Sequence, residues 1–508
     1  MSFRFTMSLS ALSLAVLSGP SLADVTAAQA WDDWKSYMQG FGYEMSGTET
    51  VSGDTLTISD IVMAYDLPED AGDLSITMGD FSFTDTGSGT VSVALPTEMP
   101  VAFDLTPKDG ESAKGVVMIT QTNPVMIVSG EENDLTYTTS ANSMSMTLDS
   151  LEVGGQPLPA TLFDIAFSLT DLSNITRMQV GNIRSYTQTM GVSEMSYTIK
   201  VDIPEGPDAG KIAATGGASG LSYSGSGTLP IDIDVSDMDA MLAAGFSFDG
   251  EFAYSSGNVD MDALTPDGAF VATSSTGGGA AKIAMGTDGL VYDVSQNDLK
   301  VSAEKIPNFP FPVNLEMARS AFKFIMPLQA KDEEQDFAFG MTFGDFSISD
   351  VIWNLFDPSE QLPRDPATIS LDLSGKAKVL VNLMDPEQAA LIDNGTVPGE
   401  LNALNINSIL VSAVGAELAG NGAFTFDNSD TVTFDGLPKP TGAVDITLSG
   451  ANKLMDTLVE MGMLPQEQAL GARMMMGLFG VAQGDDVLTS KVEVNSEGHV
   501  LANGQRLR

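Results

Sequence analysis

Apolar and polar residues alternate along most of this chain, which is the repeat of a strand with one buried and one exposed side. One apolar and one polar face per strand is typical of antiparallel sheets that are covered on a single side. The sequence therefore predicts a mainly β (α+β) fold of long, curved antiparallel sheets covered by a few helices. The clearest alternating runs are Leu74/Ile76/Met78, Val91/Val93/Leu95, Phe337/Phe339/Met341/Phe343, Ile369/Leu371/Leu373 and Val444/Ile446/Leu448.

Five windows show the helical repeat instead of the strand repeat. In the first, Trp31, Trp34 and Met38 fall on one face, which favours a helix packed on a sheet. In the third, Asp385 is followed by Pro386, and these residue types are preferred at the cap and the first turn of a helix. The predicted helices span residues 26–40, 236–244, 385–392, 451–463 and 466–482, and a final strand pair is predicted at 487–494 and 500–507.

Two distant segments, 76–83 and 341–348, share the pattern Thr-x-Gly-Asp-Phe-Ser. The similarity favours two related halves, although β-rich chains that use few residue types also resemble themselves by chance. The predicted division is an N-terminal β-rich half with the leading helix at 24–250 and a C-terminal β-rich half with a Met-rich helical pair at 251–508. Candidate boundaries are the Gly/Ser-rich residues 274–279 and the segment with Pro307, Pro310 and Pro312.

Residues 1–23 have the organisation of a cleaved signal peptide. Arg4 supplies the positive charge, a short apolar stretch follows, and small residues precede Ala23. We expect cleavage between Ala23 and Asp24, and no lipid attachment because no Cys lies at that site. No later stretch reaches the roughly 18 apolar residues of a transmembrane helix, so none is expected. Export without cysteines favours a periplasmic protein of a bacterium.

The charge balance narrows the classes of partner. The 508 residues include 23 Lys+Arg against 68 Asp+Glu, a formal net charge of -45. A chain this acidic repels phosphate backbones, so we expect no nucleic-acid partner. The same charge disfavours adsorption to anionic lipid headgroups. Diffuse association of soluble cations is expected rather than a specific calcium site, because the sequence has no calcium-loop pattern.

Few residue types suited to catalysis are present. The chain has no Cys and a single His, His499, at a predicted hairpin turn. Thiol nucleophiles and multi-His metal sites are therefore excluded, and no phosphate-binding or nucleophile-elbow motif is found. We predict a protein that is not an enzyme and needs neither metal nor cofactor. The alternative is a carboxylate-dependent glycan-acting enzyme built on a close acid pair such as Asp485 and Asp486.

Methionine is unusually abundant, with 28 residues. Flexible, polarisable Met side chains can line a groove for acyl chains, or fill irregular gaps in a core. The predicted helical pair near the C-terminus concentrates them, and it supplies the candidate apolar binding residues. These are Met455, Met461, Met463, Met474, Met475, Met476, Leu478 and Phe479.

The C-terminal third carries the residues of a family resemblance. The segments 362–368, 420–424 and 440–446, together with the Met-rich helical pair, resemble the bacterial envelope family catalogued as domain of unknown function 2125. The resemblance covers most of the mature chain and consists of strand and glycine patterns. It implies a Gram-negative, alphaproteobacterial envelope protein without an established activity. No functional residue is carried over from it.

Together these features predict an exported, soluble periplasmic protein that is non-catalytic and binds an apolar, lipid-like ligand or an envelope partner. An outer-membrane β-barrel is the alternative, although 3 Trp and 9 Tyr are few for two aromatic girdles. The sequence does not predict an oligomeric state.

Overall fold

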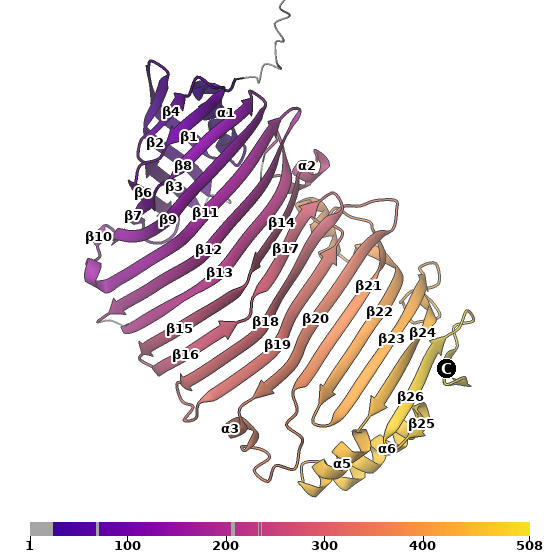
Figure 1. Ribbon diagram of the computed structural model, residues 1–508. Coiled ribbons are helices and arrows are strands. Elements are labelled where there is room, and N and C mark those ends of the chain that lie inside the picture. Colours follow the sequence, from indigo (N-terminus) through magenta and orange to yellow (C-terminus); the bar gives the residue numbers. More distant parts are fainter. Residues whose placement is uncertain (1–23, 68–70, 205–208, 232, 235) are drawn as a thin grey trace, which may run out of the picture.

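The computed structural model describes residues 24–67, 71–204, 209–231, 233–234 and 236–508. The predicted signal peptide, with Ala23, lies outside these residues. The described chain is mainly β, with one large antiparallel sheet and a few helices, as the alternating pattern predicted (Figure 1).

The helices are α1 (Ala27–Gln39), α2 (Met238–Ala243), α3 (Asp350–Trp353), α4 (Pro386–Asp393), α5 (Ala451–Glu460) and α6 (Gln466–Phe479), with a 3-10 turn at Ala160–Leu162. The strands of the N-terminal part are β1 (Glu44–Ser52), β2 (Thr55–Leu67), β3 (Gly72–Met78), β4 (Phe81–Asp85), β5 (Thr90–Ala94), β6 (Glu98–Pro107), β7 (Ala113–Thr122), β8 (Val125–Glu131), β9 (Asp134–Val153), β10 (Gln156–Pro157), β11 (Phe163–Val180), β12 (Ile183–Ile203) and β13 (Gly210–Pro230). The remaining strands are β14 (Ser247–Tyr254), β15 (Ser256–Thr265), β16 (Gly268–Thr276), β17 (Gly279–Gly286), β18 (Gly289–Lys305), β19 (Val313–Met326), β20 (Gln335–Ile348), β21 (Ala367–Val379), β22 (Gly399–Ala413), β23 (Ala416–Asp427), β24 (Lys439–Ser449), β25 (Val481–Gly484), β26 (Val487–Val494), β27 (Val500–Ala502) and β28 (Gln505–Arg506).

The sheet is a meander in which neighbours in sequence are neighbours in space. Several long strands are interrupted once, so that β3 and β4 both pair with β2, and β14 and β15 both pair with β13. Likewise, β7 and β8 both pair with β9, and β16 and β17 both pair with β18. Strands β5 and β6 pair with β4 and β3, the two parts of the preceding long strand. Every long strand from β1 to β26 therefore lies beside the next one along the chain.

Left-handed residues interrupt the extended backbone in the middle of several strands. Asp60, Asp171, Asp298 and Asp345 have φ between 48° and 54° and lie in β2, β11, β18 and β20. Asp tolerates this conformation better than most side chains, and such a residue inside a strand bends it as a β-bulge does. The left-handed residue Asp171 leaves the strand register unchanged, but it brings apolar residues three positions apart to one side, as Leu169 and Leu172 share one buried cluster.

The similar segments 76–83 and 341–348 each lie where a long strand is interrupted or bent. The second segment carries the left-handed Asp345, and the first spans the interruption between β3 and β4. Both therefore mark a bend in a long strand. The proposed division into two halves stays a prediction: residue 250 lies within β14, which pairs with strands on both of its sides.

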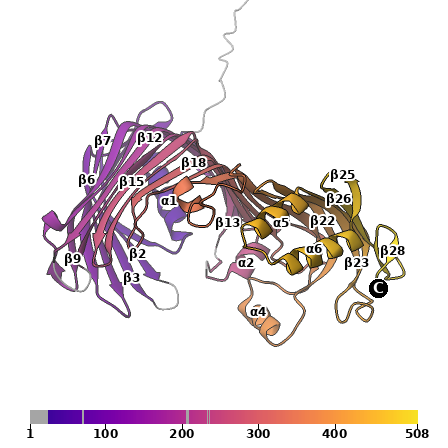
Figure 2. The same ribbon diagram turned by 90° about the horizontal axis from the view of Figure 1, so that it is seen from below.

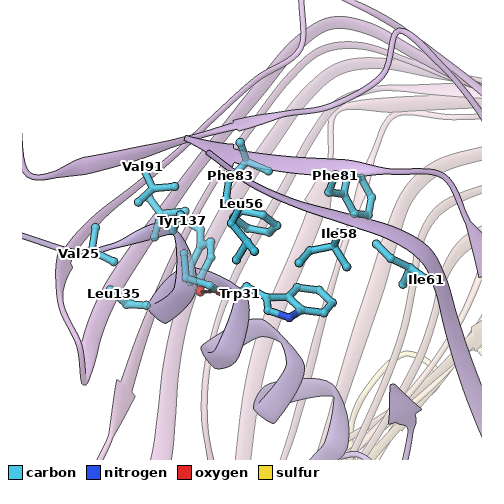
Figure 3. Packing of buried hydrophobic residues seen from close by; sticks show 14 of the residues in the cluster. Val25, Trp31, Leu56, Ile58, Ile61, Phe81, Phe83, Val91, Leu135 and Tyr137 are labelled. Carbon is cyan, nitrogen blue, oxygen red and sulfur yellow. Dashed lines mark hydrogen bonds between the residues drawn. The ribbon is translucent and has the colours of Figure 1, made fainter. Parts of the chain in front are cut away.

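The sheet curves over the helices, which lie on one of its sides (Figure 2). At the N-terminal end, strands β1–β9 wrap around α1 and form the main core. Trp31 of α1 is 2% exposed and sits among Leu56, Ile58 and Phe83 (Figure 3). Tyr137 of β9 closes the cluster from the other side. We call the side on which the helices pack the inner face, and the opposite side the outer face.

Three local predictions from the sequence differ from the structure. The last helix ends at Phe479 rather than at 482, because Ser490 and Asn503 donate hydrogen bonds to the Phe479 carbonyl, each at 2.7 Å, and the chain continues as β25. The predicted strand 500–507 is two short strands, because Asn503 and Gly504 have positive φ and form a turn. Residues 274–279 are not a linker: they belong to β16, β17 and the interruption between them.

Candidate functional site: the inner face of the sheet

The strand register identifies which side chains share the inner face. Directly paired residues of an antiparallel sheet point to the same side. Tyr137 lies on the inner face, because its hydroxyl hydrogen-bonds to Asp33 of α1. Tyr137 pairs with Thr176, and Thr176 pairs with Gln188 of β12, so all three side chains lie on the inner face. Met190, two residues after Gln188 on β12, points to the same side. One row of successive partners then crosses the inner face through Met190, Tyr223, Phe252, Ala281, Val294, Phe322, Met341, Leu371, Ile409, Gly420 and Ile446.

The adjacent row on the outer face has the opposite chemistry. Its successive partners are Ser224, Glu251, Lys282, Asp293, Lys323, Gly340, Asp372 and Ser408. Lys282 Nζ donates to Glu251 Oε1 at 3.0 Å, a cross-strand ion pair that stays in solvent. The alternation seen in the sequence therefore separates an apolar inner face from a polar, charged outer face over most of the sheet.

The apolar face is open to solvent along the middle of the molecule. We call this open part of the inner face the floor. It consists of the inner-face residues of β12 from Tyr186 to Ile199, together with their successive cross-strand partners on the strands from β13 to β24. Large apolar floor residues are between 36% and 46% exposed, far more than core residues of these types. They are Ile199, Phe252, Ile283, Tyr292, Phe322, Phe343, Ile369, Val411 and Leu418. Contiguous exposed apolar surface marks a binding surface on a folded protein.

Aromatic rings meet on the floor without hydrogen-bonding partners at their edges. Phe322 lies 6.0 Å from Tyr292 and 5.7 Å from Phe339, measured between ring centroids in edge-on geometry. Met190, Met285 and Met341 add flexible side chains to the same rows. Such a surface contacts hydrocarbon through dispersion and burial, and it offers few directional contacts to a polar ligand.

The N-terminal end of the inner face is closed by α1. Thr26 and Gln29 form a capping box that starts the helix, which confirms the predicted helix at 26–40. Arg184 of β12, 4% exposed, donates to the Asp33 carboxylate at 2.6 Å and to Ser36 Oγ at 3.0 Å. Tyr137 Oη donates to the other Asp33 oxygen at 2.8 Å. Burial, and then the negative charge of Asp33, raise the pKa of Tyr137 well above its usual range.

The C-terminal end is covered more loosely by α5 and α6. A cleft of about 260 Å³ separates α6 from the sheet. Met475, Met476 and Phe479 line it from the helix, and apolar side chains line it from the sheet, namely Leu418, Ile446, Leu448 and Leu488. The inner-face rows therefore continue under α6, and the space between them and the helix is incompletely filled.

The structure divides the candidate residues proposed from the sequence. Met475, Met476 and Phe479 line the cleft, whereas Met474, at 73% exposed, and Leu478 point away from the sheet on the other side of α6. Met463 is also exposed, between the two helices. Met455 and Met461 are half-buried and do not line the cleft. The floor residues of β12–β22 were not proposed from the sequence, although their alternation was visible in it.

One member of the acid pair considered for catalysis, Asp486, has a structural role. Asp486 Oδ1 and Oδ2 accept the backbone N–H groups of Asn452 and Lys453, each at 2.9 Å, and so cap α5. Burial acts to raise the pKa of Asp486, but these hydrogen bonds outweigh it, and the pKa is lowered. Within the ranges that the structure describes, no group of three acidic, His or Cys residues is arranged to hold a metal ion.

Another hollow lies elsewhere, on the outer face. It measures about 600 Å³ and is lined mostly by small polar residues such as Ser196, Thr215, Ser219 and Asn258. Short side chains and glycines leave the backbone of β12 and β13 shallowly covered there. The inner face is the stronger candidate binding site, because its apolar chemistry is uniform over many strands. No helix of the described chain is both long and apolar enough to cross a membrane.

Comparison with known sequences adds no family: no family model and no curated protein matches the chain.

Proposed function

We propose that this protein is an exported, non-catalytic periplasmic protein that holds the hydrocarbon chains of a lipid-like ligand against the floor. The observation that carries the proposal is the open, apolar inner face. Each methylene group moved from water onto such a surface contributes about 0.8 kcal/mol when fully buried. Several floor contacts are therefore enough to retain an alkyl chain without any hydrogen bond.

The dimensions of the floor suit more than one chain. Eleven long strands, from β12 to β24 with β14/β15 and β16/β17 each counted once, carry its rows. Adjacent strands lie roughly 4.8 Å apart, so the floor extends for roughly 50 Å. One leaflet of a bilayer has a hydrocarbon thickness of roughly 15 Å. A single acyl chain would cover only part of the floor. We propose that alkyl chains enter from the open side, because α1 fills the N-terminal end.

Cellular location and family enter as further parts of the proposal. The signal-peptide pattern of residues 1–23 supports export, and the resemblance to the envelope family supports a Gram-negative periplasm. An open apolar floor is suited to lipid traffic between two membranes, because hydrocarbon chains that cross an aqueous compartment are stabilised by burial against an apolar surface.

The proposal is tested by identifying what lies on the floor in the purified protein. Native mass spectrometry followed by organic extraction should recover lipid in at least stoichiometric amount. Photo-crosslinking places the lipid: a benzophenone amino acid at Phe322 or Ile369 should crosslink to it, whereas the neighbouring outer-face positions Ala321 and Ser370 should not. Equal crosslinking at both faces, or a ligand-free mass, would contradict the proposal. Crosslinks from Phe322 to another protein would instead identify an envelope partner.

A further inference from the structure

The floor contains no charged side chain among the rows defined above. The nearest cation on the inner face is Arg184, at the end of β12, and Asp33 neutralises it. Lysines of the central strands, such as Lys282 and Lys323, lie on the outer face. A ligand whose chains rest on the floor therefore meets no cation of the described floor rows that could bind a phosphate or carboxylate group.

One long edge of the floor is strongly acidic. The chain crosses from β13 to β14, β17 to β18, β19 to β20, β21 to β22 and β23 to β24 at this edge, which we call the acidic rim (residues 231, 233–234, 236–246, 287–288, 327–334, 380–398 and 428–438). Lys331 is the one basic residue in the described part of the acidic rim. Its acidic residues include Asp288, Asp332, Glu333, Glu334 and Asp393, all of them exposed.

The acidic rim bends toward the inner face rather than away from it. Helices α2 and α4, which belong to these connections, lie on the same side of the sheet as α5 and α6 (Figure 2). Asn382 Nδ2, beside α4, donates to Asp239 Oδ2 of α2 at 3.4 Å. Because five long strands separate β13 from β21 in the meander, this contact runs along the opening of the curved sheet. Headgroups of lipids whose chains rest on the floor would lie beside these carboxylates.

We infer that the inner face selects phospholipids with an ammonium-bearing, zwitterionic headgroup over phospholipids with a net negative headgroup. The inference rests on the proposed function and specifies its ligand class. An anionic headgroup at the opening is repelled by the acidic rim, whose one described basic residue, Lys331, already pairs with Asp288 at 3.4 Å. A zwitterionic headgroup has no net charge, and its terminal ammonium can approach the rim carboxylates while the phosphate stays hydrated. Discrimination here comes from repulsion of the wrong headgroup, which is a common source of specificity.

The test is a competition between two lipids with identical acyl chains. The delipidated full-length protein is incubated, in EDTA and about 0.1 M salt, with vesicles of equimolar phosphatidylethanolamine and phosphatidylglycerol, and reisolated. Bound lipids are quantified by mass spectrometry. We expect phosphatidylethanolamine to exceed phosphatidylglycerol about fivefold, from several carboxylates within about one Debye length of the headgroup. The ratio should fall toward one at 1 M salt, where the Debye length is about 3 Å.

Two charge-reversal variants separate the acidic rim from overall charge. The rim variant combines Glu333→Lys, Glu334→Lys and Asp393→Lys. The control combines Glu194→Lys, Asp260→Lys and Asp262→Lys, three exposed residues of the outer face. Both variants change the net charge equally. We expect the headgroup preference to disappear or invert in the rim variant and to persist in the control.

Failure of the inference is distinguishable from failure of the proposed function. If neither lipid binds to any variant, the proposed function is wrong. If both lipids bind equally, or if the two variants behave alike, the inner face holds lipid but the acidic rim does not select headgroups, and this inference alone is overturned.

Discussion

Asp33 and Arg184 lie 151 positions apart in the sequence, and their side chains meet at 2.6 Å in a buried ion pair. The pair joins α1 to β12, and α1 thereby occupies the N-terminal end of the same face that is open further along the sheet. Tyr137 and Ser36 complete the hydrogen bonding of the two charged groups. Helix α1 therefore fills the N-terminal end of the inner face, whereas the floor between α1 and α6 stays open to solvent.

Removing one member of this pair should destabilise the fold severely. Arg184→Met leaves the Asp33 carboxylate buried without its cation, and breaking such a pair costs about 3–5 kcal/mol. The measurement is the free energy of unfolding in urea, followed by Trp fluorescence. Lys200→Met is the control, because Lys200 lies on the same strand in an exposed pair with Asp164. That variant should change stability by no more than about 1 kcal/mol. Similar losses in the two variants would contradict the buried role of Arg184.

Tyr137 makes stability sensitive to high pH. Its pKa is raised in the folded chain, first by burial, so the fold binds the tyrosine proton more tightly than the unfolded chain does. The stabilisation is therefore complete below the unfolded pKa of about 10 and is lost as pH rises above that value, by up to about 1.4 kcal/mol per pH unit. Urea unfolding of the wild type and Tyr137→Phe between pH 9 and 11 should show a shallower decline in the variant. Parallel curves would mean that other groups dominate the alkaline decline.

A charge placed on the floor should remove ligand binding with little effect on folding. Phe322 and Phe343 are more than one third exposed, so Phe322→Asp or Phe343→Asp buries no new charge in the free protein. In the complex the carboxylate would be covered by hydrocarbon, and we expect copurifying lipid to fall at least roughly tenfold, since a buried unpaired charge costs several kcal/mol. Ala321→Asp and Thr342→Asp, on the outer face of the same strands, are the controls. Unchanged lipid content in the floor variants would argue against the site.

Substitutions of the Met residues of α6 should change stability by different amounts, depending on whether the Met faces the sheet or solvent. Met476 lines the cleft against the sheet, whereas Met474 is exposed on the other side. Met476→Asp should detach α6 and lower stability by about 2–4 kcal/mol through lost apolar burial and an unpaired charge. Met474→Asp should be within about 0.5 kcal/mol of the wild type. Hydrogen exchange of the α6 amides reports the detachment, and equal exchange in both variants would contradict the packing.

The strand residues with left-handed backbone should accept glycine better than a branched side chain. Asp171 has φ of 50° within β11, where an ordinary L residue is strained by about 1–2 kcal/mol. Asp171→Val should lower the free energy of unfolding by at least that amount, and Asp171→Gly should be nearly neutral. Thr170→Val, one residue earlier in extended backbone, serves as the matched control. If the Val variants at 170 and 171 were equally stable, the left-handed backbone would not be required.

The amino-acid sequence by itself determined the class of fold. Alternation of period two, as in Phe337/Phe339/Met341/Phe343, predicts antiparallel strands with one apolar side, because successive side chains of a strand point to opposite faces. The spacing of Trp31, Trp34 and Met38 placed the first helix, and the capping Asp385 placed α4 closely, because these signals act over a few turns of backbone. The net charge also leads us to expect no nucleic-acid partner, because long-range repulsion depends on composition rather than on folding.

Only the tertiary structure decided which apolar residues form a core and which remain open. Ile58 and Phe322 have the same surroundings in an alternating pattern, yet Ile58 is buried beneath α1 and Phe322 is 37% exposed. The difference depends on where α1 and α6 dock, and those contacts join residues that are far apart in the sequence, as Asp33 and Arg184 are. The left-handed Asp residues that shift the apolar side of a strand by one position could not be identified from the sequence either. An Asp in a strand pattern gives no indication of whether its φ is positive or negative. A strand's own sequence specifies its two faces, whereas the covering of a face depends on the whole chain.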